Sequence, residues 1–254
     1  MISTNDLAKY SKEWKIDNYA IMREYMQLVI LGALYQINNS EQIYFKGGTA
    51  LRLIYKSIRF SEDLDFNSKL PREEIIKILK KSIDHIKDIF PGIYLDTIKN
   101  KYDNIHTRAM YKSIDLPQPL NIAIDVNTKD GALTEYTSLL SSPFPLPYYS
   151  FIKTLGLDEI LAEKISALMN RSKGRDVFDI WFLLNRQVKI DMELLEKKMK
   201  LYNKQITIED IINKIKQYDE KKLKNELNKY LPENQRNIIP FLKDSLTKIL
   251  LPLK

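Results

Sequence analysis

Two aspartates separated by one residue are the side chains of this sequence best placed to do chemistry. Asp63 and Asp65 lie in residues 61–66 (SEDLDF), where Leu64 and Phe66 give the alternation typical of a strand. Alternate strand residues point to the same face, so the two carboxylates should converge. Neighbouring carboxylates repel unless a cation neutralises them, and oxygen ligands suit Mg²⁺. The spacing therefore predicts a metal site, with a solvated acidic turn as the alternative.

A Gly-Gly-Thr turn shortly before these aspartates could hold phosphate. Gly47 and Gly48 let the backbone approach a ligand, and the helix expected from Ala50 to Tyr55 would point free N–H groups at it. The Thr49 hydroxyl could cap that helix or contact a phosphate. The alternative is an ordinary tight turn with a threonine cap.

Asp125 could supply a third carboxylate. It lies in residues 121–126 (NIAIDV), an apolar stretch expected to form an interior strand, where an aspartate needs a partner. Shared metal coordination is one explanation. A strand-end aspartate in a turn with Asn127 is the other, and the residues do not choose between them.

A second group of charged residues follows in the later part of the chain. Lys164 lies on the apolar stripe of a helix expected over residues 157–171, so its ammonium group should point inward and need an anion. A triphosphate and the nearby aspartates are both candidates, and the alternative is a lysine that reaches the surface.

Asp176 and Asp179 are three residues apart at the start of the next expected helix and share a face. Arg175 could pair with Asp179 or with Glu163, whereas simple stabilisation of the helix N-terminus is the plainer interpretation of the acids. We expect a charge cluster that faces the Asp63–Asp65 site and closes a cleft, formed by Glu163, Lys164, Arg175, Asp176 and Asp179.

The composition narrows the chemistry further. The chain has 254 residues and no cysteine, which excludes disulfides and thiolate zinc sites. With only two histidines, His85 and His106, a multi-histidine metal site is impossible. The net charge of +7 fits a polyanionic partner, although it also serves solubility. No signal peptide or membrane span is visible, so we expect a cytoplasmic protein.

The elements that must position these residues follow from periodicity and turn signals. A proline-rich connector at residues 141–148 suggests a boundary between domains 1–145 and 146–254, the second almost wholly helical. In the first we expect helices over 16–37, 50–55 and 71–90, and strands over 42–45, 93–100, 107–113 and 120–126. In the second we expect helices over 157–171 and 175–186, then three or four more after residue 191.

Taken together, four motifs resemble the DNA polymerase β-type nucleotidyltransferase superfamily and, more closely, the AbiEii/AbiGii toxin family that includes the MenT toxins. They are Gly-Gly-Thr-x-Leu-Arg from Gly47, the segment 59–66, Glu163-Lys164 and Arg175-Asp176-x-x-Asp179. The resemblance implies an α+β protein: a nucleotidyltransferase-fold mixed sheet with flanking helices, then a helical C-terminal domain that completes the active-site cleft.

The resemblance also implies an activity, the transfer of a nucleoside monophosphate from an NTP to an acceptor. Some relatives are similar to toxins that modify tRNA and are paired with an antitoxin, so tRNA and a cognate antitoxin are the expected partners. The nucleotide and the oligomeric state stay open. A catalytically silent module that binds RNA or protein, and an enzyme that modifies a small molecule such as an antibiotic, remain alternatives.

On this interpretation each candidate residue has a role. One or two Mg²⁺ ions would be held by Asp63 and Asp65, with Asp125 as a third ligand, and either Asp125 or Asp176 would accept the proton of the attacking hydroxyl. The nucleotide would be bound by Gly47, Gly48, Thr49, Arg52, Arg59, Ser61 and Lys164, with Glu163, Arg175 and Asp179 in support.

Overall fold

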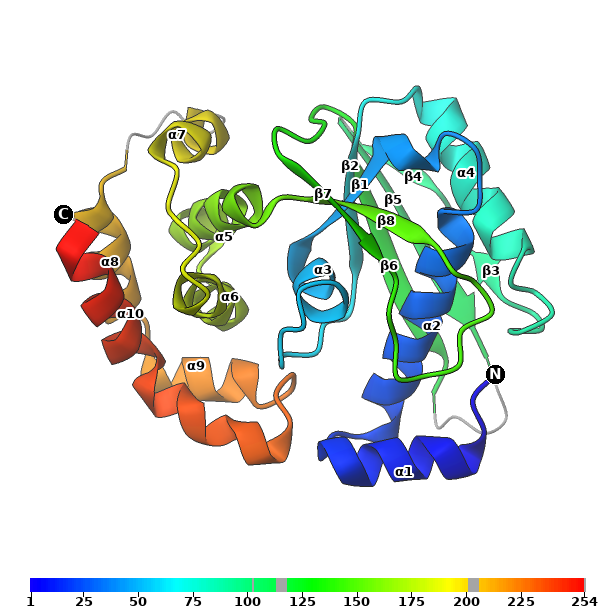
Figure 1. Cartoon of the computed structure of the whole chain (residues 1–254), viewed down its shortest axis with the longest axis horizontal. Helices are drawn as coiled ribbons and strands as arrows, with labels where there is room; N and C mark the ends of the chain where they lie inside the picture. Colours follow the sequence, from blue (N-terminus) through cyan, green and yellow to red (C-terminus); the bar gives the residue numbers. More distant parts are fainter. Residues whose placement is uncertain (102, 113–117, 201–205, 254) are drawn as a thin grey trace. The chain divides into compact units, whose positions relative to one another are not determined.

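The computed structural model describes residues 1–101, 103–112, 118–200 and 206–253, and it divides into two compact units (Figure 1). Unit 1 is Met1–Leu155 and unit 2 is Gly156–Lys254. The division falls later than the boundary expected at residues 145 and 146, because a strand beyond the proline-rich connector still belongs to the sheet of unit 1.

A mixed sheet forms the centre of unit 1, in the order β3-β5-β6-β2-β1-β8-β7, with β4 paired to β5. Parallel pairs join β2 to β6 and β1 to β8, whereas β1–β2, β5–β6 and β7–β8 are antiparallel. This mixed sheet agrees with the expected α+β class. The strands are β1 Ile43–Lys46, β2 Leu64–Ser68, β3 Tyr94–Leu95, β4 Lys99–Lys101, β5 Asn104–Tyr111, β6 Leu120–Asn127, β7 Glu135–Leu139 and β8 Phe151–Leu155.

Helices α2 and α4 lie side by side against one face of this sheet (Figure 1). The strand residues that face them, such as Phe45, Phe66 and Ile124, are buried and form the core. On the other face, the alternating residues of β2 and β6 include Asp65 and Asp125, which are less buried, and Asn67, which is fully buried. The helical elements of unit 1 are α1 Thr4–Trp14, α2 Asn18–Leu34, η1 Ser40–Gln42, α3 Gly47–Leu53 and α4 Arg72–Asp84.

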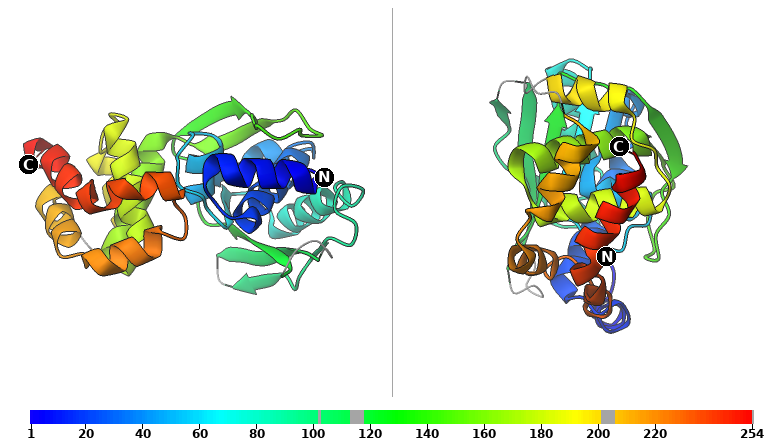
Figure 2. Two further views of the ribbon diagram at one scale, coloured as in Figure 1. Left: turned by 90° about the horizontal axis from the view of Figure 1, so that it is seen from below. Right: turned by 90° about the vertical axis from the view of Figure 1, so that its left-hand side faces the viewer.

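Unit 2 is helical, and its helices run in several different directions (Figure 2, right). Helix α5 packs against both α6 and α7, and α10 packs against α6 and α8. The elements are α5 Leu157–Arg171, α6 Gly174–Asn185, α7 Met192–Lys200, α8 Ile208–Lys216, α9 Glu220–Leu227, η2 Glu233–Phe241, α10 Leu242–Leu250 and η3 Leu251–Leu253.

Several expected elements differ from the observed ones. Strand β8 lies where helices were expected, and the helix expected to run to residue 90 ends at Asp84. The strand expected over 93–100 is two short strands, β3 and β4, and the far end of the strand expected to residue 113 falls outside the described residues. In the part of the chain that the structure describes, no helix is both long and apolar enough to cross a membrane.

Candidate active site

The sheet register brings four polar residues into one row across four neighbouring strands. Lys46 of β1 is opposite Asp65 of β2, Asp65 is beside Asp125 of β6, and Asp125 is opposite His106 of β5. Residues paired across strands point to the same face and lie side by side. The structure therefore places Asp125 next to Asp65, although the two are sixty positions apart in the sequence.

The turn after β1 packs directly on this row. Gly47 has a φ of +77°, which places it in the left-handed region, and a Cβ atom there would overlap the carboxylate of Asp65. Glycine is thus needed at position 47 for two reasons: the backbone conformation and the close approach of Asp65.

We expect Gly47→Ala to abolish nucleotidyl transfer while lowering the free energy of unfolding by about 1–2 kcal/mol, the cost of a side chain in the left-handed region. Gly92→Ala is the matched control, since Gly92 has a φ of +82° and a Cβ there would meet nothing within 4 Å. Thermal unfolding and a transfer assay on both variants separate backbone strain from displacement of Asp65. Equal activity in the two variants would show that the approach of Gly47 to Asp65 is unimportant.

The residue after the two glycines ties the turn to the aspartates. Thr49 is 1% exposed, and its hydroxyl donates a hydrogen bond to the backbone carbonyl of Asp63. Asp63 itself lies immediately before β2 rather than within it. The hydroxyl of Thr49 therefore fixes the position of Asp63 relative to the glycine turn.

Arg59 lies beneath the same turn and is almost completely buried, at 1% exposure. Its Nη1 donates to the carbonyl of Phe60 at 2.9 Å, and a Cβ at position 48 would overlap its guanidinium. The same Cβ would come 2.9 Å from the Oγ of Ser61. Gly48 thus allows Arg59 and Ser61 to pack against the turn.

Arg52 is held by neighbours on three sides. Its guanidinium forms two hydrogen bonds with Glu24 of α2, at 2.7 and 3.1 Å, and donates to the carbonyl of Ser57 at 3.0 Å. It also lies over the ring of Phe60, 3.9 Å from the centroid. In this arrangement Arg52 connects α3 to α2 and to the loop that leads to the aspartates.

Asp125 and His106 form a partly exposed pair at one end of the row. The Nδ1 of His106 lies 2.7 Å from the Oδ1 of Asp125, and the two side chains are 34% and 42% exposed. His106 was not among the candidate residues. It lies one residue before the strand predicted over 107–113, and only the pairing of β5 with β6 brings it to Asp125.

In unit 2, Lys164 points inward and its partners are aspartates. Its Nζ lies 2.7 Å from the Oδ2 of Asp179 and 3.7 Å from the Oδ1 of Asp176, and both aspartates are fully buried. Asp176 also accepts two hydrogen bonds from Arg171, at 3.0 and 3.1 Å. Arg171 was not among the candidate residues, and the expected pairing of Arg175 with Asp179 or Glu163 stays a prediction.

A second buried ion-pair group lies on the other side of α5. Lys198 of α7 lies 2.7 Å from Glu159 and 3.0 Å from Glu163. Burial alone would lower the pKa of Lys198, but the charges and hydrogen bonds of Glu163 and Glu159 outweigh it and raise the pKa above its usual value. Glu163 thus pairs with a residue of the C-terminal tail, for which no motif was recognised.

The tail also holds the loop between α5 and α6. Glu226 of α9 accepts a hydrogen bond from the backbone N–H of Gly174, the first residue of α6. The Tyr218 hydroxyl donates to the carbonyl of Ser172 at 3.1 Å and lies 3.1 Å from Glu226, and burial raises the pKa of this tyrosine. These contacts fix the segment that carries Asp176 and were not predicted.

The carboxylates of unit 1 have the chemistry of a divalent-cation site. Asp65 and Asp125 are adjacent on one face, and Asp63 stands at the start of the same strand. Oxygen donors of this kind suit Mg²⁺. Among the described residues, no group of three or more such side chains already stands in metal-binding geometry.

Comparisons with known structures agree with the fold described above. MenT4, a nucleotidyltransferase toxin from Mycobacterium tuberculosis, is similar in structure with a TM-score of 0.70 and 16% identity, over 100% of this chain and 91% of that one. JHP933 from Helicobacter pylori is similar with a TM-score of 0.59 and 21% identity, over 94% and 93%. At these identities the likeness shows the fold, and no curated protein matches by sequence.

The family comparison covers most of the chain. Residues 29–244 match the family described as the nucleotidyl transferase AbiEii toxin of type IV toxin–antitoxin systems. That range includes the glycine turn, the aspartates and the ion pairs around Lys164. The chain therefore belongs to the AbiEii family of nucleotidyltransferase toxins.

Proposed function

We propose that this nucleotidyltransferase requires Mg²⁺ and transfers a nucleoside monophosphate from an NTP to RNA, with tRNA as the acceptor and a cognate antitoxin as its cellular counterpart. The observation that carries the proposal is the row of Lys46, Asp65 and Asp125 packed against the Gly47 turn. It combines a cation, two carboxylates and a glycine turn on one face of the sheet.

Asp63, Asp65 and Asp125 would hold one or two Mg²⁺ ions, since all three offer carboxylate oxygens in the same part of unit 1. When bound, Mg²⁺ would offset the negative charge of the triphosphate and of the departing pyrophosphate. The Gly47–Thr49 turn would seat the phosphates, because it begins α3 directly beside Asp65, and the backbone N–H groups of a first helical turn have no partner within the helix.

The reaction itself needs an attacking hydroxyl and a proton acceptor. The acceptor hydroxyl oxygen would form a bond to the α-phosphorus of the NTP as the bond to the bridging oxygen breaks and pyrophosphate leaves. Asp125 is better placed than Asp176 to take the proton, because its side chain is 42% exposed whereas Asp176 is fully buried and ion-paired. His106 would orient the Asp125 carboxylate through its hydrogen bond.

Arg52 and Arg59 take more structural roles in this proposal, whereas Lys164 does not. Arg52 and Arg59 would shape the loop around the nucleotide rather than contact the triphosphate first, since both already bond to protein groups. Lys164 keeps the triphosphate-binding role that its motif suggests, and its ion pair with Asp179 would hold the ammonium group in place.

The test is transfer of label from each of the four NTPs, labelled at the α-phosphate, to total tRNA with and without Mg²⁺. We expect labelled tRNA from wild-type protein with Mg²⁺, and none after chelation or in the Asp63→Ala/Asp65→Ala double variant. Label that persists in the double variant would contradict the assignment of these aspartates. Mg²⁺-dependent NTP binding without transfer to any RNA would instead favour a small-molecule acceptor.

A further inference from the structure

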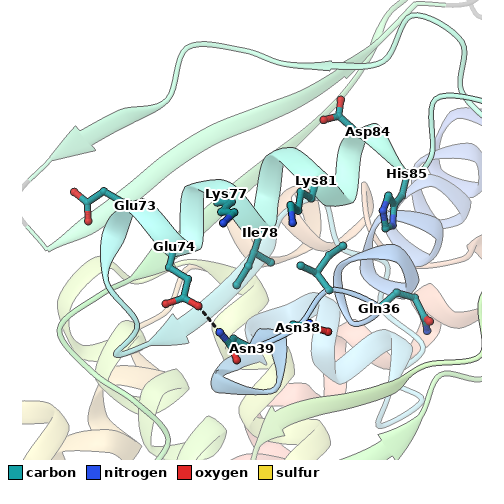
Figure 3. Close-up of a pocket in the computed structure, with 11 residues that line it drawn as sticks. Gln36, Asn38, Asn39, Glu73, Glu74, Lys77, Ile78, Lys81, Asp84 and His85 are labelled. Atoms are coloured by element: carbon teal, nitrogen blue, oxygen red, sulfur yellow. Dashed lines mark hydrogen bonds between the residues drawn. The ribbon is translucent and has the colours of Figure 1, made fainter.

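Helix α2 and the segment that follows it have different neighbours along their length. The segment after the helix, residues 36–39, borders a cavity of about 770 Å³ against α4 (Figure 3). The lining of this cavity mixes carboxylates with lysines, and none of its residues belongs to the row at Asp65 or to the glycine turn. The part of α2 before Leu28 instead contacts the loop of residues 54–63, which leads from α3 to the candidate aspartates.

Two polar side chains of α2 hold this loop. Arg23 and Gln27 are four residues apart, which puts them on the same side of the helix. The Nε2 of Gln27 donates a hydrogen bond to the carbonyl of Ser61 at 3.2 Å, and the Nη1 of Arg23 lies 2.7 Å from the Oε1 of Glu62. Helix α2 therefore holds the two residues that come directly before Asp63.

Gln27 is a polar residue in a buried part of α2. Its neighbours in the helix, Met26 and Leu28, are buried apolar residues, and Gln27 is itself only 1% exposed. A buried amide costs free energy unless it is hydrogen-bonded, and an apolar residue at this position would avoid that cost. The bond to Ser61 is what the glutamine provides. Because Gln27 is closed off from solvent, it can act on the reaction only through the loop.

The glycine turn fixes the same short segment from another direction. The Thr49 hydroxyl donates to the carbonyl of Asp63, and the Oγ of Ser61 packs close to Gly48. The turn and α2 together hold residues 61–63, the last part of the loop before β2. This matters for chemistry because Mg²⁺ requires near-ideal octahedral geometry, so a carboxylate that binds it must be held accurately in place.

We propose that Gln27 and Arg23 are positioning residues for nucleotidyl transfer, which hold Asp63 where it can bind Mg²⁺. The metal role of Asp63 rests on the proposed function, whereas the grip of α2 on the loop rests on the contacts described above. Both residues precede the range 29–244 that matches the family. Loss of either contact would let the loop shift, and this would weaken Mg²⁺ binding although every ligand is still present.

The test is calorimetry of each of the four NTPs over a series of Mg²⁺ concentrations, on the full chain of wild type and of Gln27→Met. Methionine keeps the length of glutamine but cannot donate to Ser61. We expect the Mg²⁺ concentration for half-maximal NTP binding to rise about tenfold. At saturating Mg²⁺, kcat for transfer to total tRNA should fall about tenfold, with KM for the NTP nearly unchanged.

Two further variants serve as controls. The buried hydroxyl of Ser150 donates to the carbonyl of Gly32 on α2 at 2.8 Å, so Ser150→Ala loses a bond of the same kind away from the loop. Ser150→Ala should lower the melting temperature as Gln27→Met does, but leave the Mg²⁺ dependence unchanged. Arg23→Met should shift the Mg²⁺ dependence in the same direction as Gln27→Met, and Arg23→Lys should recover most of it because the positive charge beside Glu62 is kept.

The outcomes separate this proposal from the proposed function. If Gln27→Met and Arg23→Met shift the Mg²⁺ dependence no more than Ser150→Ala does, the positioning role is overturned. If Asp63→Ala leaves Mg²⁺-dependent NTP binding unchanged, the metal assignment in the proposed function is refuted instead. A shift in the two α2 variants alone, with this binding lost in Asp63→Ala, supports the proposal whether or not tRNA accepts the nucleotide.

Discussion

Asp65→Asn should lower the rate of nucleotidyl transfer by roughly 10³-fold or more, with little change in thermal stability. The amide has the shape of the carboxylate and can keep its place between Lys46 and Asp125, so the sheet should fold as before. The amide lacks the negative charge that would hold Mg²⁺ beside the triphosphate. Losing one preorganised electrostatic group of this kind typically costs about 10²–10³ in rate, and a metal ligand should cost at least as much.

The measurement is steady-state transfer at saturating NTP, together with calorimetry of NTP binding at several Mg²⁺ concentrations. In Asp65→Asn the Mg²⁺-dependent part of NTP binding should disappear. Asp88→Asn is the control, since Asp88 is an exposed aspartate of the same unit outside the row. Near-normal transfer in Asp65→Asn would remove Asp65 from the metal site and leave the row with a structural role only.

The residues of the row formed by Lys46, Asp65, Asp125 and His106 differ in how far the sequence could predict them. Asp65 could be predicted because its alternation with Leu64 and Phe66 is local, and Gly47 because glycine pairs are unusual between a strand and a helix. His106 could not, because its contact with Asp125 depends on the register of β5 on β6. The packing of the whole sheet decides which strands pair and in which register, and local periodicity does not predict either.

In unit 2 as well, the helices were easier to predict from the sequence than the contacts between them. The helices over 157–171 and 175–186 were predicted almost to the residue, since their apolar stripes are regular. The partners of their charged residues were predicted only in part, since the nearby aspartates had been one of two candidate partners for Lys164. The contact of Arg171 with Asp176 and the pairing of Glu163 with Lys198 of α7 were not predicted. Strand β8 was missed because the chain after the proline-rich segment was expected to be almost wholly helical, and only its pairing with β1 and β7 assigns it to the sheet.

Lys164→Met should lower the free energy of unfolding by roughly 3 kcal/mol, because it removes the positive charge beside two fully buried aspartates. Asp176 would retain Arg171, but the ammonium group 2.7 Å from Asp179 would be lost. We expect the melting temperature to fall by about 10 °C. A second change, Asp179→Asn, should restore much of this loss, since it removes the charge that Lys164 neutralises.

Lys198→Met is the matched control, since Lys198 also neutralises two acids, the buried Glu159 and the partly exposed Glu163, but carries no expected role in catalysis. Its loss of stability should be similar. Assayed well below both melting temperatures, Lys198→Met should keep transfer close to wild type, whereas Lys164→Met should lose it, and Lys164→Met/Asp179→Asn should regain stability without activity. Recovery of activity along with stability in that double variant would show that Lys164 serves only to neutralise Asp179. Failure of both lysine variants to lose stability would mean that these buried pairs contribute little to the fold, as can happen when desolvation cancels the attraction between the charges.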